Sequence, residues 1–226
     1  MKLASPSETL FSPLIEQAIE LSAQWHDQTY RKKRWRDAPF EVPAHAILRV
    51  PVIAHVTAVA LTVQRAAWHD EPIAAAFLHD VLEDANRYGR QMRMEELREA
   101  LGEDVLRHVL DVSEEQFDEA GEPIPWRPRK EDYVTRLRDT SPGSAAISLA
   151  DKLHNLWSIN QGLARGVNVF REDEQGRGLS YGPEEQLWFH EAVLGATEVY
   201  DDPRLAPMRE RLRSEIEAFR ARTGPR

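Results

Sequence analysis

The sequence predicts an all-α protein built as a single domain. Nearly every apolar pattern in it follows the helical period, and no segment alternates every second residue between hairpin turns. The chain has 226 residues, of which 42% are hydrophobic, so it is long enough to bury one core. It has no fixed-period repeat and no low-complexity tract. We therefore treat residues 1–226 as one multi-helix unit.

The first helices are predicted from the capping and proline residues at which they begin. Ser12 followed by Pro13 is a good N-cap and first-turn pair for a helix that runs to about residue 28. Pro51 can open a second helix. Pro72 can open a third, which is apolar on nearly all sides and is therefore expected at the centre.

The remaining elements follow from Gly and Pro positions and from apolar spacing. Residues 116–127 are expected to form a loop, and residues 164–182, with several glycines, are the least ordered part of the interior. The later helices are expected over residues 94–101, 103–112, 128–139, 142–163, 183–200 and 203–222.

Composition excludes several kinds of protein. Cysteine is absent, which rules out disulfides and cysteine-ligated metal clusters. No apolar stretch reaches the roughly 18 residues of a membrane span, and the N-terminus lacks the layout of a signal peptide. These features favour the cytoplasm and no membrane partner.

The charge balance bears on the kind of ligand. A formal net charge of −9 disfavours stable nucleic-acid binding, which depends on phosphate neutralisation by Lys and Arg. It still permits a small anionic substrate, because a local cationic pocket can act at contact distance.

The pair His79-Asp80 lies in the most hydrophobic predicted helix. A buried Asp is costly unless it is paired or bound to a metal, and a lone His–Asp pair is often only a hydrogen-bonded core pair. Helical spacing adds Glu83 one turn after His79 and Asp84 one turn after Asp80. Packing alone does not account for four polar groups on an apolar helix.

Two further apolar helices each carry ionisable or polar groups of the same kind. Asp151 is followed four residues later by Asn155, and His55 lies in the segment VIAHVTAVA. A divalent cation at the junction of the three helices would satisfy these groups. Two imidazoles and two carboxylates suit a first-row ion, which could lower the pKa of a bound water and polarise a phosphoryl oxygen.

Together these blocks resemble the hydrolase domain of the RelA/SpoT-type guanosine tetraphosphate hydrolases, including the small stand-alone members. The matching pieces occur in the family's order and lie at residues 18–32, 53–60, 74–85, 129–137 and 148–156. The resemblance implies an HD-type bundle with a hydrolase core over residues 14–163. Residues 164–226 would then add a flexible loop and C-terminal helices.

The resemblance also assigns roles to residues. His55, His79, Asp80 and Asp151 match the metal ligands, usually of Mn²⁺. Glu83 and Asp84 match the acidic pair that orients and deprotonates the attacking water. The residues that match nucleotide contacts of the family are Asn155, Arg31 and Lys32.

The chain departs from the family beside the expected pocket. It inserts residues 33–51 after the basic segment, and Val56 stands where a proline usually follows the histidine. This departure bears on which nucleotide is the substrate.

Other candidate residues have weaker patterns. The run RKKRWR at residues 31–36 is either a solvated helix end, a phosphate clamp with a stacking Trp35, or a nucleic-acid tract. Lys130 and Tyr133 share a helix face, which is either solvated or faces the substrate. His154 is expected to support the site rather than bind the metal, and His190 has no partner pattern.

The function that these residues favour is metal-dependent hydrolysis of a guanosine alarmone to GDP or GTP and pyrophosphate. One alternative is hydrolysis of another nucleotide, such as a dNTP, a nucleoside monophosphate or NADPH. A second is a non-catalytic nucleotide sensor, which would have no need of the acidic pair. A purely structural helical adaptor would leave the buried acids unexplained. A homo-oligomer stays open.

Overall fold

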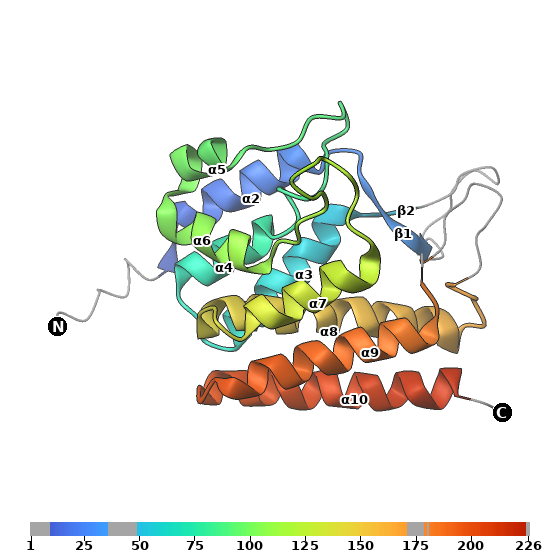
Figure 1. The fold of residues 1–226 in the computed structure, drawn as a ribbon. Coiled ribbons are helices and arrows are strands. Elements are labelled where there is room, and N and C mark those ends of the chain that lie inside the picture. The colour runs from blue at the N-terminus through green and yellow to red at the C-terminus, as the bar shows by residue number, and fades with distance from the viewer. Residues whose placement is uncertain (1–9, 36–48, 171–178, 180, 225–226) are drawn as a thin grey trace, which may run out of the picture.

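The computed structural model describes residues 10–35, 49–170, 179 and 181–224, and within them the all-α prediction is confirmed (Figure 1). The helices are α2 (Pro13–Trp25), α3 (Val52–Arg65), α4 (Asp70–Leu78), α5 (Met94–Leu101), α6 (Glu103–Val112), α7 (Trp126–Leu137), α8 (Pro142–Ala164), α9 (Pro183–Ala196) and α10 (Ala206–Thr223). Two short 3-10 helices, Thr197–Val199 and Pro203–Leu205, join α9 to α10.

Side-chain caps start two of these helices where the sequence predicts them. The Ser12 hydroxyl accepts a hydrogen bond from the Ile15 amide at 3.3 Å, which confirms the predicted cap of α2. In the same way the Ser141 hydroxyl accepts from the Ser144 amide at 3.1 Å and starts α8. In both helices a proline in the first turn has no amide hydrogen to satisfy.

The prediction that one helix carries the whole stretch from Pro72 to Asp84 is wrong. Helix α4 ends at Leu78, and the residues that follow form turns in which the amides of Glu83 and Asp84 donate to the Asp80 carbonyl at 3.2 and 2.9 Å. Hydrogen bonds from distant parts of the chain hold these turns in place of further helical hydrogen bonds. The Trp25 indole donates to the Asp84 carbonyl at 2.8 Å and so ties this turn to α2.

A small antiparallel hairpin is the second departure from the prediction. Strand β1 (Tyr30–Trp35) pairs with β2 (Arg49–Pro51), with Tyr30 opposite Pro51 and Trp35 opposite Arg49. The helix-end interpretation is therefore wrong for residues 31–35. Gln28 has a φ of 57°, which turns the chain away from the α2 axis before the strand begins. Residues 36–48 of the insertion lie outside the described residues.

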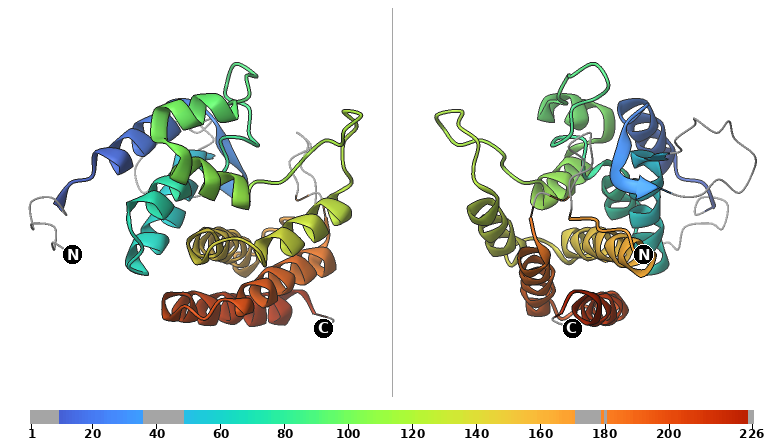
Figure 2. Two further views of the ribbon diagram at one scale, coloured as in Figure 1. Left: turned by 60° about the vertical axis from the view of Figure 1, so that its left-hand side comes forward. Right: turned by 90° about the vertical axis from the view of Figure 1, so that its right-hand side faces the viewer.

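Helix α8 lies between two groups of helices. Figures 1 and 2 show α9 and α10 along one side of it, with α3 and α4 on the other. Buried apolar side chains from α2 to α10 form one hydrophobic cluster, in which Leu149, Leu156 and Leu212 are fully buried. The same packing brings the C-terminal end of α4 against α8, where the candidate site lies. No helix in the described part of the chain is both long and apolar enough to cross a membrane.

We predict that α10 contributes directly to the stability of the whole fold. Leu212 in α10 is fully buried, so Leu212→Ala should lower the free energy of unfolding by about 2–5 kcal/mol because it leaves a cavity. Urea denaturation followed by circular dichroism measures this. Leu110→Ala in α6 is the matched control, since Leu110 is 37% exposed, and its effect should be about 1 kcal/mol or less. Equal effects of the two changes would contradict the prediction.

Candidate active site

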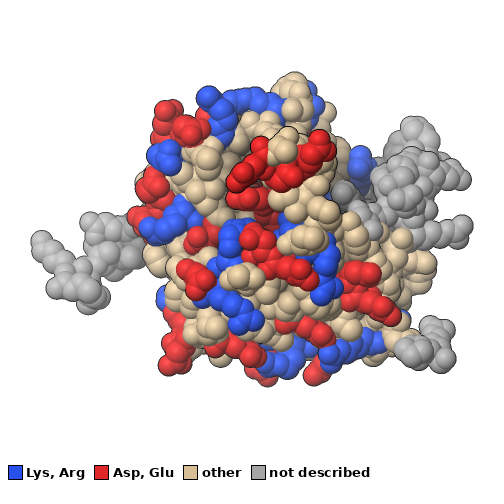
Figure 3. Space-filling view, viewed as in Figure 1, with Lys and Arg blue, Asp and Glu red and all other residues tan. Residues whose placement is uncertain are grey.

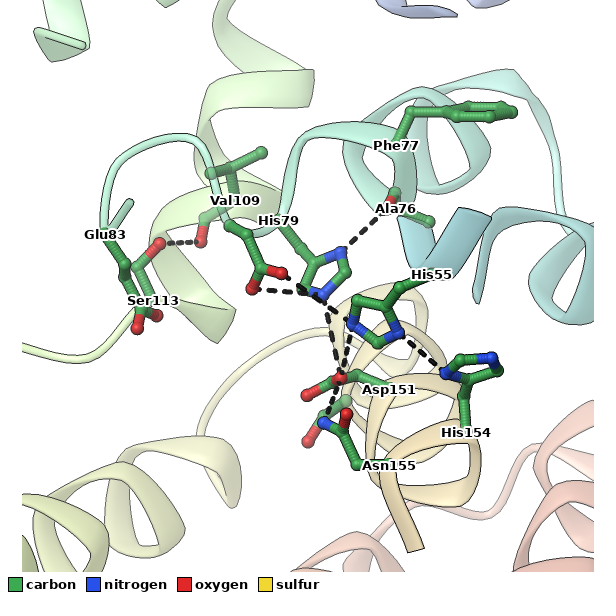
Figure 4. Close-up of polar contacts among 12 residues, drawn as sticks. His55, Ala76, Phe77, His79, Glu83, Val109, Ser113, Asp151, His154 and Asn155 are labelled. Atoms are coloured by element: carbon green, nitrogen blue, oxygen red, sulfur yellow. Dashed lines mark hydrogen bonds and ion pairs between the residues drawn. The ribbon is translucent and has the colours of Figure 1, made fainter. Parts of the chain in front are cut away.

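Four predicted metal ligands converge from three parts of the fold. His55 comes from α3, His79 and Asp80 follow the end of α4, and Asp151 comes from α8 (Figure 4). One ligand atom from each of His55, His79 and Asp80 lies within 4.8 Å of the others. An oxygen of Asp151 lies 3.2 Å from His55 Nε2 and 3.7 Å from His79 Nε2. Each imidazole Nε2 thus lies within 3.7 Å of an oxygen of both Asp80 and Asp151, and His55, His79 and Asp80 together form a possible cation site.

The two histidines present the same nitrogen to this cluster. The Nδ1 atom of His79 lies 2.8 Å from the Ala76 carbonyl, which can only accept, so Nδ1 carries the hydrogen and Nε2 has a free lone pair. His55 Nδ1 is likewise engaged, at 2.8 Å, by His154 Nδ1. Both Nε2 atoms are buried and have no hydrogen-bond partner among the described residues. Buried, unpartnered nitrogens aimed at carboxylates fit a metal site.

His154 therefore lies behind His55 and not at the cluster itself, as Figure 4 shows. This agrees with the expected supporting role. An outer hydrogen bond of this kind fixes the orientation of a ligand imidazole.

The charges of the cluster are strongly perturbed. Burial alone would raise the pKa of Asp151, but Lys152, whose Nζ lies 2.6 Å from Asp151 Oδ2, holds it well below its usual range. Burial and the nearby Arg31 lower the pKa of His55 to about 4. Burial would also lower the pKa of His79, but Asp80 and Asp151 raise it to about 9. A proton and a cation would therefore compete for His79 Nε2.

Asn155 links the cluster to the basic strand. Its amide donates to Asp151 Oδ1 at 2.6 Å, and its carbonyl oxygen accepts a hydrogen bond from the Arg31 guanidinium. The structure thus brings Arg31 to Asp151 and Asn155 on α8, which lie far from it in the sequence. The side chain of Lys32 lies outside the described part of the structure.

The two predicted acidic residues lie in different surroundings. Asp84 lies on the wall of a pocket beside the cluster, together with Asp80. Glu83 instead accepts a hydrogen bond from the Glu114 amide at 2.9 Å, and Figure 4 shows it apart from His55, His79 and Asp151. Burial, followed by the charges of Glu114 and Asp80, raises the pKa of Glu83 to about 8.

The pocket itself has a volume of about 320 Å³ and joins the metal cluster to a cationic and aromatic wall. Of the predicted substrate contacts, Arg31, Asn155 and Lys130 line it. Tyr133 is 1% exposed and its hydroxyl lies 2.6 Å from the Ser148 hydroxyl, so it lies beneath the wall. A substrate contact for Tyr133 stays a prediction without geometric support.

Several pocket residues were not predicted from the sequence, among them Lys152, Trp126 and His190. Lys152 directly follows Asp151 in an apolar helix, and a Lys at such a position was itself a signal of a buried ion pair. Trp126 stacks on Tyr181 with ring centroids 4.5 Å apart, and His190 lies on α9. The last two come from segments in which the sequence carries no recognisable chemical pattern.

Away from the pocket, the surface shows no field of a single sign on the face seen in Figure 3. Acidic and basic side chains are interspersed over it. The local cations of the pocket, and not the mean charge of −9, therefore determine which ligands it attracts.

Most of the chain matches a known family of domains. The HD domain family matches residues 43–173, which include all four candidate ligands. The chain belongs to the HD domain family. The resemblance to guanosine tetraphosphate hydrolases is confirmed as well, because this chain is 30% identical over 102 residues to the guanosine-3′,5′-bis(diphosphate) 3′-pyrophosphohydrolases MESH1 of Mus musculus and Homo sapiens. That alignment covers 45% of this chain, and the chain spans about half the length of these relatives.

Solved structures support the same fold. One, described as a metazoan ortholog of SpoT that hydrolyzes ppGpp, matches with a TM-score of 0.62 and 22% identity over 97% of this chain and 98% of that one. Another, lmo0812 from Listeria monocytogenes EGD-e, matches with a TM-score of 0.58 and 24% identity over 72% of this chain and 96% of that one. At these identities the likeness concerns the HD fold alone.

We predict that a divalent cation stabilises this HD domain through the cluster. Saturating Mn²⁺, at about 100 times its Kd, should stabilise the fold by about 2.7 kcal/mol and raise Tm by about 5–10 °C in differential scanning fluorimetry. His79→Ala should abolish the shift. His69→Ala is the matched control, since His69 is largely exposed and remote from the cluster, and it should keep the shift. An equal shift in the His79→Ala protein would contradict the assignment.

The buried His190 predicts a loss of stability in acid. Burial lowers its pKa to about 4 from the ordinary 6.5, so the unfolded chain takes up a proton that the folded chain excludes. Its contribution is full above pH 6.5 and is lost as the pH falls from 6.5 towards 4, by about 3 kcal/mol at most. Urea unfolding of the wild type and His190→Gln across this range measures it. The variant should show a shallower loss, and parallel pH profiles would refute this assignment.

Proposed function

We propose that this HD domain hydrolyses a guanosine alarmone, releasing pyrophosphate and GDP or GTP in a metal-dependent reaction. The observation that carries the proposal is the pair of buried, unpartnered Nε2 atoms facing two carboxylates at the wall of a cationic pocket. The similarity to pyrophosphohydrolases of this specificity supports the substrate class.

His55, His79, Asp80 and Asp151 would hold the cation. Mixed imidazole and carboxylate donors suit a first-row divalent ion, and we propose Mn²⁺. When bound, such an ion lowers the pKa of a water and polarises a phosphoryl oxygen. The Ala76 carbonyl keeps His79 in the tautomer that leaves Nε2 free, and the contact with His154 orients the His55 ring so that its Nε2 faces the cluster.

Asp84 is the better placed of the two acidic residues to take the proton of the attacking water. Asp84 lines the pocket together with Asp80, whereas the Glu83 carboxylate accepts a hydrogen bond from the Glu114 amide. A general base must come within hydrogen-bond reach of the proton that it removes. Glu83 would then act by orienting the turn that carries Asp84, or by a movement towards the pocket on substrate binding.

The phosphates would bind at the cationic wall. Arg31, Lys130 and Lys152 line the pocket, and Arg31 is oriented by Asn155. Lys130 is in turn paired with Glu114, so its Nζ is fixed near the pocket. Lys32 extends this cationic strand, and Asn155 would add an amide contact to the nucleotide.

A different nucleotide is the second candidate substrate. Strand β1 supplies Tyr30 and Arg31 to the pocket and leads directly into the insertion at residues 33–51, which the related family lacks. A dNTP, a nucleoside monophosphate or NADPH could take the same metal and phosphate contacts. A non-catalytic sensor would bind nucleotide without turnover. In any of these cases the ligand is a small nucleotide, and we place the reaction in the cytoplasm.

The decisive assay is incubation of the protein with Mn²⁺ and guanosine tetraphosphate, followed by separation of the products. We expect equimolar GDP and pyrophosphate, with turnover removed by EDTA and restored by Mn²⁺. A panel of dNTPs, monophosphates and NADPH is run in parallel. Turnover of one of these with no hydrolysis of the tetraphosphate to GDP and pyrophosphate would overturn the proposed substrate.

Removal of the acidic side chains should slow turnover and leave binding intact. Asp84→Asn and Glu83→Gln should each reduce kcat by about 10²–10⁴-fold, because proton transfer or its geometry is lost, while the Kd for substrate stays within a few-fold. Glu99→Gln is the matched control on exposed α5 and should behave as wild type. Unchanged turnover in both variants would exclude the acidic pair from catalysis.

A further inference from the structure

Helix α9 brings to the pocket a histidine that the proposed chemistry does not use. His190 lines the pocket and is 2% exposed. Its Nε2 atom is buried and has no hydrogen-bond partner among the described residues. A buried polar atom without a partner is costly, and its position in a ligand pocket indicates that a ligand supplies the partner.

The backbone fixes which hydrogen-bonding role this nitrogen has. The Nδ1 atom of His190 lies 2.7 Å from the Gln186 carbonyl, one helical turn earlier. A carbonyl oxygen only accepts, so Nδ1 carries the hydrogen and Nε2 of the neutral ring is an acceptor. Burial, with the charge of Lys152 acting in the same direction, lowers the pKa of His190 to about 4 and so keeps the ring neutral at physiological pH.

An acceptor of this kind does not suit a phosphate. Ionised phosphate oxygens are acceptors themselves, and the pocket already offers them Arg31, Lys130 and Lys152. His190 instead requires a ligand group that carries a hydrogen. On a nucleotide such groups are the N–H groups of the base and the hydroxyls of the ribose.

We propose that His190 is a specificity residue that accepts a hydrogen bond from the nucleoside part of the ligand, either a base N–H or a ribose O–H. The inference rests on the proposed function only in taking a nucleotide as the ligand. Gln186 lies one turn away on the same face of α9 and also lines the pocket, where its amide can both donate and accept. Residues of helix α9 would therefore contact the nucleoside, while residues of α8, α7 and β1 would bind the phosphates.

This arrangement discriminates against ligands that lack the donor. Such a ligand would cover Nε2 without satisfying it, and an unsatisfied buried acceptor weakens binding more than a missing surface contact does. Pyrophosphate, which has no nucleoside, would not reach His190 and serves as the internal control.

The test compares GDP with pyrophosphate by isothermal titration calorimetry in Mn²⁺. His190→Phe keeps the ring shape but removes the acceptor, so we expect GDP binding to weaken about tenfold and pyrophosphate binding to stay within twofold of wild type. His190→Gln, which restores an acceptor near the Nε2 position, should recover most of the GDP affinity. Wild-type protein titrated with 2′-deoxy-GDP, 3′-deoxy-GDP, IDP and N1-methyl-GDP separates the sources. Each analogue lacks one donor, so the weakest binder lacks the donor that His190 contacts.

Several outcomes would overturn the inference. These are an equal loss for GDP and pyrophosphate, no loss for GDP, or wild-type protein that binds pyrophosphate but not GDP. The analogue titrations use wild type alone, so they stand even where the Phe variant fails to fold. Equal affinity for GDP and all four analogues would then count against the inference. Turnover of guanosine tetraphosphate is scored separately. His190-dependent GDP binding without that turnover would refute the proposed function and keep the inference.

Discussion

The convergence of two imidazoles and two carboxylates in a buried junction is the constraint on which the rest of this structure depends. Each carboxylate that leaves water costs several kcal/mol unless opposite charge or hydrogen bonds replace its hydration. In the observed arrangement of α3, α4 and α8, the Nε2 atoms of His55 and His79 each lie 3.2–3.7 Å from oxygens of both Asp80 and Asp151. Helix α4 is apolar on nearly all sides because it packs against its neighbours on every side. Its C-terminal end leads directly to His79 and Asp80.

Lys152 is the largest compensation within the chain. Its ammonium lies 2.6 Å from Asp151 and near the rings of Tyr133 and Phe189, at 4.9 and 5.2 Å from their centroids. A buried ammonium next to a carboxylate keeps that carboxylate ionised, and an ionised Asp151 is the form that binds a cation. The aromatic faces stabilise the ammonium without taking a hydrogen bond from it. The pair therefore supports both the fold and the charge state of the candidate site.

Much of the fold and of the ligand set could be predicted from the sequence, for physical reasons. Ser12 acts locally, as a cap, and a local interaction is visible in a local pattern. Ionisable residues in apolar helices also stand out, and this singled out His55, His79, Asp80 and Asp151. The end of α4 at Leu78 could not be predicted, because the Trp25 and Glu114 bonds that hold the turn come from distant segments. His190 could not be predicted either, since its role depends on which side of α9 faces the pocket.

The bond from the Trp25 indole to the Asp84 carbonyl ties the turn that carries Asp84 to a helix outside the region that matches the family. The part of the chain that matches the HD domain family, residues 43–173, holds every candidate metal ligand but neither Trp25 nor Arg31. The residues proposed to bind the cation therefore lie inside the matched region. Trp25, which holds the turn of Asp84, and Arg31, which lines the pocket, lie before it. Changes upstream of the matched region could alter the position of Asp84, and so the rate, in a protein whose metal binding is intact. For relatives recognised by that region alone, a complete ligand set is a guide to metal content and a poor guide to activity.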